Sequence, residues 1–373
     1  MAESQHKYHQ LANEVERMIK NRKLKPHDPV FSEGELAKMF NVSTMTAKMA
    51  LKHLAIQGVV YRMSRRGTFL CDSPSEIQIN DVNKELPFGA MKSISIGMIV
   101  PDLDSYISQM ISTIESEARA QHYNLMIKIS RGIEDEDSCL QQLVDERIEG
   151  IIWFPRARDY CSQQVLRLKM EGYPIVMIDR YFPEVLIDCV YPDYFEGTYQ
   201  MVEHLIHKGH REIGIVTNAI SAIGSSEDQY QGYFKALFDH EITAISKNIH
   251  IIEKTKDRTN YSDKDPLLDR FLRENPDLTA IICGDDHIAA SVLYSAMRLN
   301  ILVPNQLSIA GFSDIQLAMM LPVALTTVRQ PTEELGKEAV KLLIRRMNHC
   351  DEKQNTVKLK TQIIERDSVS VRS

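Results

Sequence analysis

The first 75 residues carry the side chains best suited to binding a polyanion. They hold 12 Lys and Arg against 7 Asp and Glu, a net charge of +5, whereas the rest of the chain holds 32 against 44, a net charge of −12. A basic head on an acidic body indicates that the head alone meets a polyanionic partner. The candidate contacts to double-stranded DNA surround one short helix and one turn: Ser32, Glu33, Ser43, Thr44, Met45, Thr46, Lys48, Lys52, Arg62, Arg65, Arg66, Gly67 and Thr68.

Three helices and a hairpin are expected to position these residues. Apolar residues recur at helical spacing in three segments, 8–19, 33–40 and 44–57. Ser32 and Ser43 stand where the second and third helices need an N-cap. Two short β-type runs, 59–61 and 68–70, follow on either side of a polar turn. This order predicts a winged helix-turn-helix over residues 1–72.

The third helix is expected to enter the major groove of DNA. Its inward face has Val42, Ala47, Ala50 and Leu54, and its opposite face has Thr44, Met45, Lys48 and Lys52. Lys48, Lys52 and Arg62 would contact phosphates. Arg65 and Arg66, at the hairpin tip, would enter the minor groove or lie on the backbone, and Gly67 permits the tight turn. The alternative is a small helical packing domain with a solvated basic face.

The remaining residues predict a separate α/β domain. Residues 73–92 have little periodicity and are interpreted as a linker. From residue 93, eight apolar runs alternate with helical patterns: 94–100, 125–129, 150–154, 174–178, 213–217, 249–252, 279–283 and 307–311. Such alternation indicates doubly wound parallel sheets. We expect two subdomains within 93–373: residues 93–180 with 325–348, and residues 181–324 with 349–373.

Polar residues after the strands predict a ligand site in this domain. Ligands of open α/β sheets bind outside the carboxyl ends of the strands. Asp286 follows one strand at the start of a helix, Asp102 and Tyr106 follow the first strand, and Arg156 follows the third. An aromatic ring offers a stacking face to a sugar, and charged groups satisfy its hydroxyls. The alternatives are helix capping by Asp285 or Asp286 and ordinary loop polarity for the other three.

Residues 7–71 resemble the GntR-type winged helix. The resemblance lies in residues 31–37 (FSEGELA), 42–48 (VSTMTAK), 51–54 (LKHL) and 66–69 (RGTF), with Gly58. It implies dimers that bind two-fold symmetric DNA sites. The family usually has Arg at the positions of Gly34 and Thr44, and often at Lys48. These departures predict weaker binding or a different half-site.

Residues 93–366 resemble the effector-binding core of the LacI/GalR repressors, which is related to periplasmic sugar-binding proteins. The resemblance lies in residues 279–290 (TAIICGDDHIAA), 303–314 (VPNQLSIAGFSD), 325–331 (LTTVRQP), 178–180 (IDR) and 204–211 (HLIHKGHR). It implies that Asp286 binds the effector and that Asp179, Gln229 and Asp314 lie at the same site. The family usually has Arg at the position of Gln229 and often Asp at Ser313, so we expect a neutral effector.

Other kinds of site find little support. The six cysteines form no CxxC pair, and no signal segment or membrane-length apolar run is present, so a reducing, cytoplasmic location is expected. His204, His207 and His210 are close in sequence, but the last lies beyond Gly209, and no metal is expected. No phosphate loop, dinucleotide fingerprint or nucleophile elbow appears, so no cofactor and no enzymatic activity are expected.

The sequence therefore predicts a homodimeric transcription regulator, a repressor, controlled by a small neutral effector. The pairing of its two parts resembles the arabinose-operon repressors of Gram-positive bacteria, which points to a pentose or a related plant sugar. The alternatives are a sugar-active enzyme with an accessory domain and a sugar-binding transport component. The first would need a catalytic base with a nucleophile or phosphate cradle, and the second an export signal.

Overall fold

The computed structural model divides the chain into two compact units, residues 1–90 and 91–373. It describes residues 11–19, 24–25, 27–42, 44–56, 59–63, 67–71, 94–156, 161–219, 224–252, 261, 264–348 and 353–372. The linker predicted at 73–92 lies outside the described residues, so its limits remain a prediction.

The first unit has the predicted order of elements. Residues 11–19 are helical, followed by α2 (Glu33–Met39), α3 (Thr44–Ile56), β1 (Val60–Met63) and β2 (Gly67–Leu70). Ser32 caps α2 as predicted, because its Oγ accepts the Glu35 N–H at 3.2 Å while Glu35 Oε2 accepts the Ser32 N–H at 2.8 Å. The strands pair antiparallel, and a bridge between Pro29 and Phe69 extends the hairpin.

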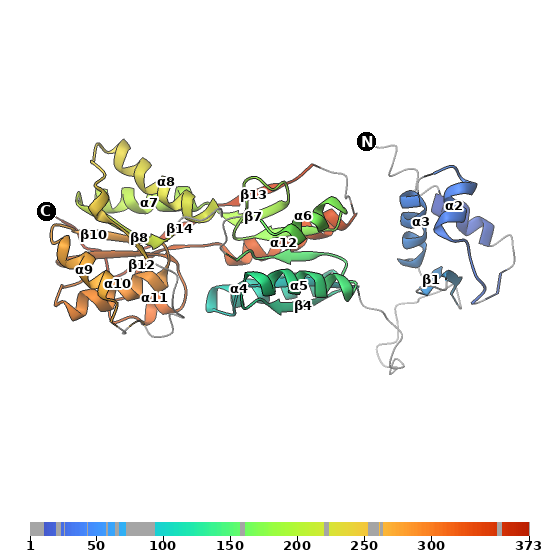
Figure 1. Cartoon of the computed structure of the whole chain (residues 1–373), viewed down its shortest axis with the longest axis horizontal. Coiled ribbons are helices and arrows are strands. Elements are labelled where there is room, and N and C mark those ends of the chain that lie inside the picture. Colours follow the sequence, from blue (N-terminus) through green and yellow to red (C-terminus); the bar gives the residue numbers. More distant parts are fainter. Residues whose placement is uncertain are drawn as a thin grey trace. The chain divides into compact units, whose positions relative to one another are not determined.

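The second unit contains two six-stranded sheets (Figure 1). The first sheet has the order β13-β7-β6-β5-β3-β4 and is entirely parallel. Its strands are β3 (Ile94–Val100), β4 (Tyr123–Ile129), β5 (Ile151–Trp153), β6 (Ile175–Ile178), β7 (Asp188–Pro192) and β13 (Thr356–Leu359). Its helices are α4 (Ser105–Ala120), α5 (Ile133–Asp145), α6 (Gln163–Met170) and α12 (Thr332–Asn348).

The second sheet has the order β14-β12-β11-β10-β8-β9, in which only β14 is antiparallel to its neighbour. Its strands are β8 (Ile213–Asn218), β9 (Ile249–Ile252), β10 (Ala280–Cys283), β11 (Ser308–Ser313), β12 (Thr326–Arg329) and β14 (Gln362–Ile364). Its helices are α7 (Tyr194–His207), α8 (Gly224–Asp239), α9 (Pro266–Glu274), α10 (Asp286–Arg298) and α11 (Leu317–Met320), with a 3-10 turn, η1 (Ser246–Asn248).

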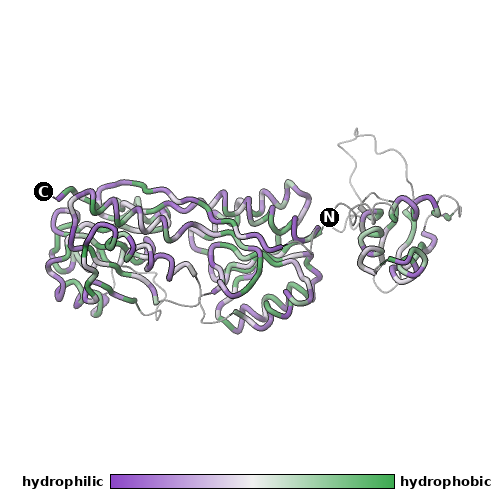
Figure 2. The backbone as a smooth tube through the Cα atoms, turned by 90° about the horizontal axis from the view of Figure 1, so that it is seen from above, coloured by the Kyte–Doolittle hydropathy of each residue, from purple (hydrophilic) through white to green (hydrophobic). Residues whose placement is uncertain are grey.

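Apolar strands form the core of each subdomain, and helices cover both faces of each sheet. The residues of the central strands of each sheet are almost all buried. Figure 2 shows hydrophobic residues in the interior and hydrophilic residues on the outer turns of the helices. Helices α4 and α12 pack against each other over one face of the first sheet. The doubly wound architecture predicted from the alternation is therefore confirmed.

The predicted division into subdomains is wrong for three strands. We expected β7 and β13 in the second subdomain and β12 in the first, but β7 pairs with β6, β13 with β7, and β12 with β11. The chain thus crosses between the sheets after β7, after β12 and after β13. None of the three forms an apolar run, since their sequences are DCVYP, TTVR and TVKL, and hydrophobic pattern alone does not mark them as strands.

Candidate effector cleft and nucleic-acid interface

A polar cavity of about 150 Å³ lies where the carboxyl ends of strands from the two sheets face each other. A cavity of roughly this volume holds a six-membered ring. It is lined by Pro101, Asp102, Asp104, Tyr106, Ile107, Phe154, Asp179, Arg180, Tyr194, Asn218, Ser225, Ser226, Gln229, Gly284, Asp285, Asp286, His287, Phe312, Ser313, Ile315 and Gln330. Of the seven residues predicted to bind an effector, five line this cavity: Asp102, Tyr106, Asp179, Gln229 and Asp286.

Asp286 is fully buried at the second-subdomain wall of the cleft. Asp285 is the residue that caps α10, accepting the Ile288 N–H at 2.7 Å, which leaves the Asp286 carboxyl directed at the cleft. Thr327 Oγ1 donates to Asp286 Oδ1 at 2.6 Å, and the Ile315 N–H donates to Oδ2 at 2.9 Å. Burial raises the pKa of Asp286 to about 8. The group is therefore held rigidly and carries a proton over much of the neutral pH range.

Asp179 is the buried carboxyl of the first-subdomain wall. Its Oδ1 accepts hydrogen bonds from the hydroxyls of Tyr106 and Tyr194, the latter at 2.8 Å. Gln330 Nε2 in turn donates to the Tyr194 hydroxyl at 3.0 Å. Burial raises the pKa of Asp179, and burial beside this carboxyl raises the pKa of Tyr106 and Tyr194 well above the ordinary tyrosine value. We call the three chain crossings between the two sheets the hinge. Since Tyr194 and Gln330 lie on two of these crossings, the network joins the cleft wall to the hinge.

The charges of the cleft favour a ligand that donates hydrogen bonds and carries no negative charge. Five aspartates line it against one guanidinium, that of Arg180. Gln229, 7% exposed, uses Nε2 to donate to Gly284 O at 2.9 Å and supplies no charge. The buried Gln330 Oε1 accepts no hydrogen bond from the described residues.

Two of the predicted cleft residues lie elsewhere. Arg156 turns away from the cavity, where its Nε donates to Ser130 O at 3.0 Å and its Nη2 donates to Pro101 O, so it braces the ends of β3 and β4. Asp314 sits between Arg329 Nε at 2.7 Å and Arg366 Nη2 at 2.6 Å. Neither side chain lines the cavity, because the position after a strand does not fix the direction of the side chain.

Several cleft residues escaped prediction. Arg180, whose guanidinium lies 5.0 Å from the centre of the Phe154 ring, and Asp104, which caps α4, are next to predicted residues in sequence. Their position after a strand could have indicated them. Tyr194 and Gln330 were missed because they follow β7 and β12, strands without an apolar run, so the predicted crossings between the subdomains fell one strand too early in the chain.

The described part of the first unit places several predicted DNA contacts on its surface. Ser32, Thr44 and Lys48 are exposed and Glu33 and Thr46 half-buried, while Ala47, Ala50 and Leu54 of α3 are buried as predicted. Thr68 is only 4% exposed, so its side chain is buried and does not lie on the surface of the first unit. Ser43, Arg65 and Arg66, the side chains of Met45, Lys52 and Arg62, and the exposure of Gly67 lie outside the described residues.

The three histidines do not converge. His210 Nδ1 lies 3.0 Å from Thr279 Oγ1, and His210 Nε2 lies 3.0 Å from Ser370 O. His204 Nε2 lies 3.7 Å from the carboxylate of Glu365. Within the described residues, no group of three His, Cys, Asp or Glu side chains is placed to hold a metal ion. No helix in the same part of the chain is long and apolar enough to cross a membrane.

Comparison with known proteins agrees with both units. Residues 7–70 match the bacterial regulatory proteins of the gntR family, and residues 202–369 match the periplasmic binding protein-like domain. The arabinose metabolism transcriptional repressor of Halalkalibacterium halodurans is 30% identical over 342 residues, 89% of this chain and 88% of that protein. The chain belongs to the gntR-family transcription regulators that carry a periplasmic binding protein-like domain.

Further relatives of this gntR-family regulator extend the likeness. The arabinose metabolism transcriptional repressor of Geobacillus stearothermophilus is 27% identical over 91% of this chain and 90% of that protein. The fold of the second unit is shared with the regulator CcpA of Lactococcus lactis, with a TM-score of 0.67 at 22% identity over 74% of this chain and 100% of that one. A LacI family regulator from Enterococcus faecium with bound ribose has a TM-score of 0.64 at 22% identity over 75% of this chain and 100% of that one. The chain is thus a DNA-binding transcription regulator.

Proposed function

We propose that this regulator is a repressor and that a neutral sugar, bound in the cleft between its two subdomains, lowers or raises its affinity for DNA. The observation that carries the proposal is the excess of hydrogen-bond acceptors over cations in the cleft, five aspartates against Arg180. Sugar hydroxyls both donate hydrogen bonds to carboxyl groups and accept them, whereas an anionic ligand would find a single guanidinium, that of Arg180, to pair with. The rings of Phe154 and Phe312 add the apolar surface that a sugar face requires.

The relatives support this choice of ligand class. Two of them are repressors of arabinose metabolism, and related folds were solved with ribose and with cellobiose. A pentose or related plant sugar is therefore our first candidate. The proposal assigns no catalytic step to the cleft.

The hinge supplies the route from ligand to DNA. A sugar that contacts both Asp179 and Asp286 would favour one angle between the subdomains, because it binds that angle better than others. We propose that the protein acts as a homodimer, with residues 1–72 as reader, 73–92 as linker and 93–373 as sensor. A change of angle would then alter the spacing of the two readers. A useful switch needs a coupling of about 1–3 kcal/mol.

Titration of the full chain on DNA tests the proposal. A labelled fragment containing the region upstream of the protein's own gene is bound in a gel-shift assay, and arabinose, xylose, ribose and cellobiose are added in turn. We expect one sugar to shift the DNA affinity by roughly 5- to 150-fold, the range for this coupling. If no sugar raises the thermal stability of the protein or changes its DNA binding, the sugar proposal fails, whereas stabilisation without a change in DNA binding would reject only the switch.

A further inference from the structure

A second cavity of about 520 Å³ lies in the first subdomain, away from the effector cleft. Its volume is within the range of roughly 300–1,000 Å³ that small-molecule sites occupy. The wall is formed at the start of β6 and β7, by the end of α12 and by the residues that precede β13. These are the amino ends of parallel strands, whereas the cleft is at their carboxyl ends. The two sites are therefore at opposite edges of the same sheet.

Three cations line this cavity against one carboxylate: Lys169, Arg346 and Lys353 against Asp188. The carboxylate is already fully engaged. Asp188 Oδ2 lies 2.6 Å from Arg346 Nε, and Oδ1 accepts from Arg346 Nη2 at 2.9 Å and from the Asn355 N–H at 2.6 Å. The charges of Asp188 and Arg346 thus cancel, and the cavity keeps the two positive charges of Lys169 and Lys353.

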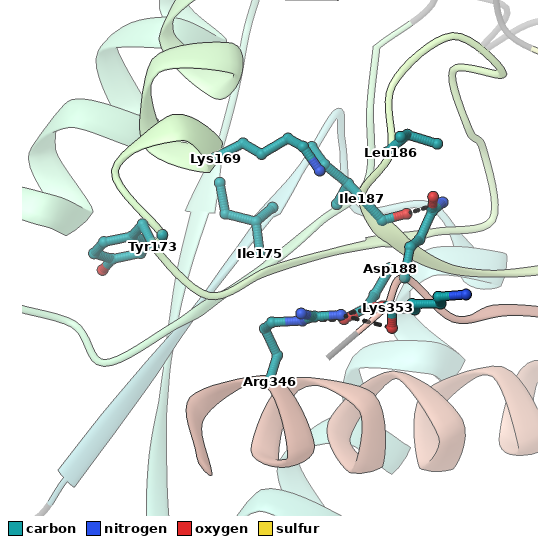
Figure 3. A pocket seen from close by; sticks show the side chains of 10 residues that line it. Lys169, Tyr173, Ile175, Leu186, Ile187, Asp188, Arg346 and Lys353 are labelled. Carbon is teal, nitrogen blue, oxygen red and sulfur yellow. Dashed lines mark hydrogen bonds and ion pairs between the residues drawn. The ribbon is translucent and has the colours of Figure 1, made fainter. Parts of the chain in front are cut away.

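The two lysine amino groups have no acidic partner within ion-pair distance among the residues that the structure describes. Figure 3 shows Lys169 reaching across the cavity toward Ile187, with Arg346, Asp188 and Lys353 on the other side. Partial desolvation of the Lys169 amino group lowers its pKa, and the nearby Arg346 guanidinium lowers it further. An anion bound between the lysines would relieve this repulsion.

The rest of the wall is apolar. Leu186 is 66% exposed at the rim, whereas Ile175 and Ile187 are buried, and the ring of Tyr173 is fixed by its hydroxyl donating to Ile148 O. Leu186 offers the organic part of an amphiphilic ligand an apolar contact beside the two lysines. The side chain of Gln354 is held by donation to Ile187 O at 2.6 Å, so the wall is preformed.

We infer that this cavity is a second ligand site, which binds an organic phosphomonoester with its phosphate between Lys169 and Lys353 and its organic part on Leu186 and Ile187. Phosphate accepts charge-assisted hydrogen bonds from lysine. The site takes an anion, whereas the effector cleft takes a neutral ligand. It therefore responds to a class of molecule that the cleft rejects.

Calorimetric titration of the full chain in a phosphate-free buffer at low salt tests the site, with phenyl phosphate, inorganic phosphate and benzyl alcohol as probes. Phenyl phosphate should bind, inorganic phosphate should bind several-fold more weakly, and benzyl alcohol should not bind. Lys169→Gln and Lys353→Gln should each weaken phenyl phosphate about tenfold, the effect of losing one charge-assisted hydrogen bond. Lys341→Gln, at an exposed lysine of α12 that pairs with Glu338, should leave it unchanged.

Three results would overturn the inference. They are no binding of phenyl phosphate at millimolar concentration, equal loss of binding in Lys341→Gln and Lys169→Gln, and equal affinity for inorganic phosphate and phenyl phosphate, which would remove the role of Leu186 and Ile187. Circular dichroism of each variant confirms that the fold is kept. Because both lysines are exposed, these substitutions should not unfold the protein.

Discussion

Two buried aspartates face the effector cleft from opposite subdomains, and they are held in different ways. Asp286 is fixed by Thr327 and Ile315, which both belong to its own subdomain. Asp179 is fixed by Tyr106 of its own subdomain and by Tyr194, which begins the first helix after a chain crossing. The difference suggests a division of labour. Asp286 should set ligand affinity, and the Asp179 network should transmit binding to the hinge.

The largest expected effect is that of Asp286→Ala. The substitution removes the ligand contact that we propose for Asp286. It also leaves Thr327 Oγ1 and the Ile315 N–H without their acceptor, which should lower the free energy of unfolding by about 1–3 kcal/mol per buried group. Sugar affinity should fall at least about 100-fold, close to 2.7 kcal/mol. Calorimetry and urea unfolding measure the two effects. Asp277→Asn, at an exposed position in the same subdomain, is the control, and a sugar affinity unchanged in Asp286→Ala would refute the role of Asp286.

A pH series tests the same carboxyl from another side. Burial raises the pKa of Asp286 to about 8 in the folded protein, while an unfolded aspartate titrates near 4. Between these values the folded state holds a proton that the unfolded state has lost. The contribution of Asp286 to stability is therefore greatest below about pH 4 and falls as the pH rises, by up to about 1.4 kcal/mol per pH unit.

The measurement is the difference in free energy of unfolding between the wild type and Asp286→Asn at pH 5, 6 and 7. Since asparagine does not titrate, the wild type should lose stability relative to the variant as the pH rises. A difference that is flat over this range would show that Asp286 is ionised throughout and that its pKa is not raised.

Arg156→Gln should separate bracing from binding. The guanidinium donates to carbonyls at the ends of two strands and does not line the cleft. Its loss should cost about 1–3 kcal/mol of stability, because buried acceptors are left unsatisfied. Sugar affinity should change by less than about twofold. Urea unfolding gives the stability and calorimetry gives the sugar affinity of the same preparation. A loss of sugar affinity without a loss of stability would show that Arg156 binds the ligand.

The sequence predicted those site residues whose place depends on their own strand or helix, and it missed those whose place depends on how the chain passes between the two sheets. Asp286 could be found because an aspartate after an apolar strand, at a helix start, faces the ligand edge of an α/β sheet. The cap at Ser32 was equally local. Tyr194 and Gln330 were missed because they follow β7 and β12, which lack an apolar run, so each predicted crossing fell one strand too early. Side-chain direction misled for Arg156 and Asp314, since packing decides it.

The smallest expected effect, and the sharpest test of the division of labour, is that of Tyr194→Phe. The substitution keeps the ring stacked on Phe312 but removes the hydroxyl that joins Asp179 to Gln330. Sugar affinity should stay within about threefold of the wild type, since one net hydrogen bond contributes about 0.5–1.5 kcal/mol. The change in DNA affinity caused by the sugar should shrink, because the cleft wall is uncoupled from the crossing at Tyr194. Tyr199→Phe, whose hydroxyl bonds Asp239 on the outer surface, is the matched control. If Tyr194→Phe lowers sugar affinity as much as Asp286→Ala does and leaves the DNA response intact, the two aspartates perform the same task and the division of labour is wrong.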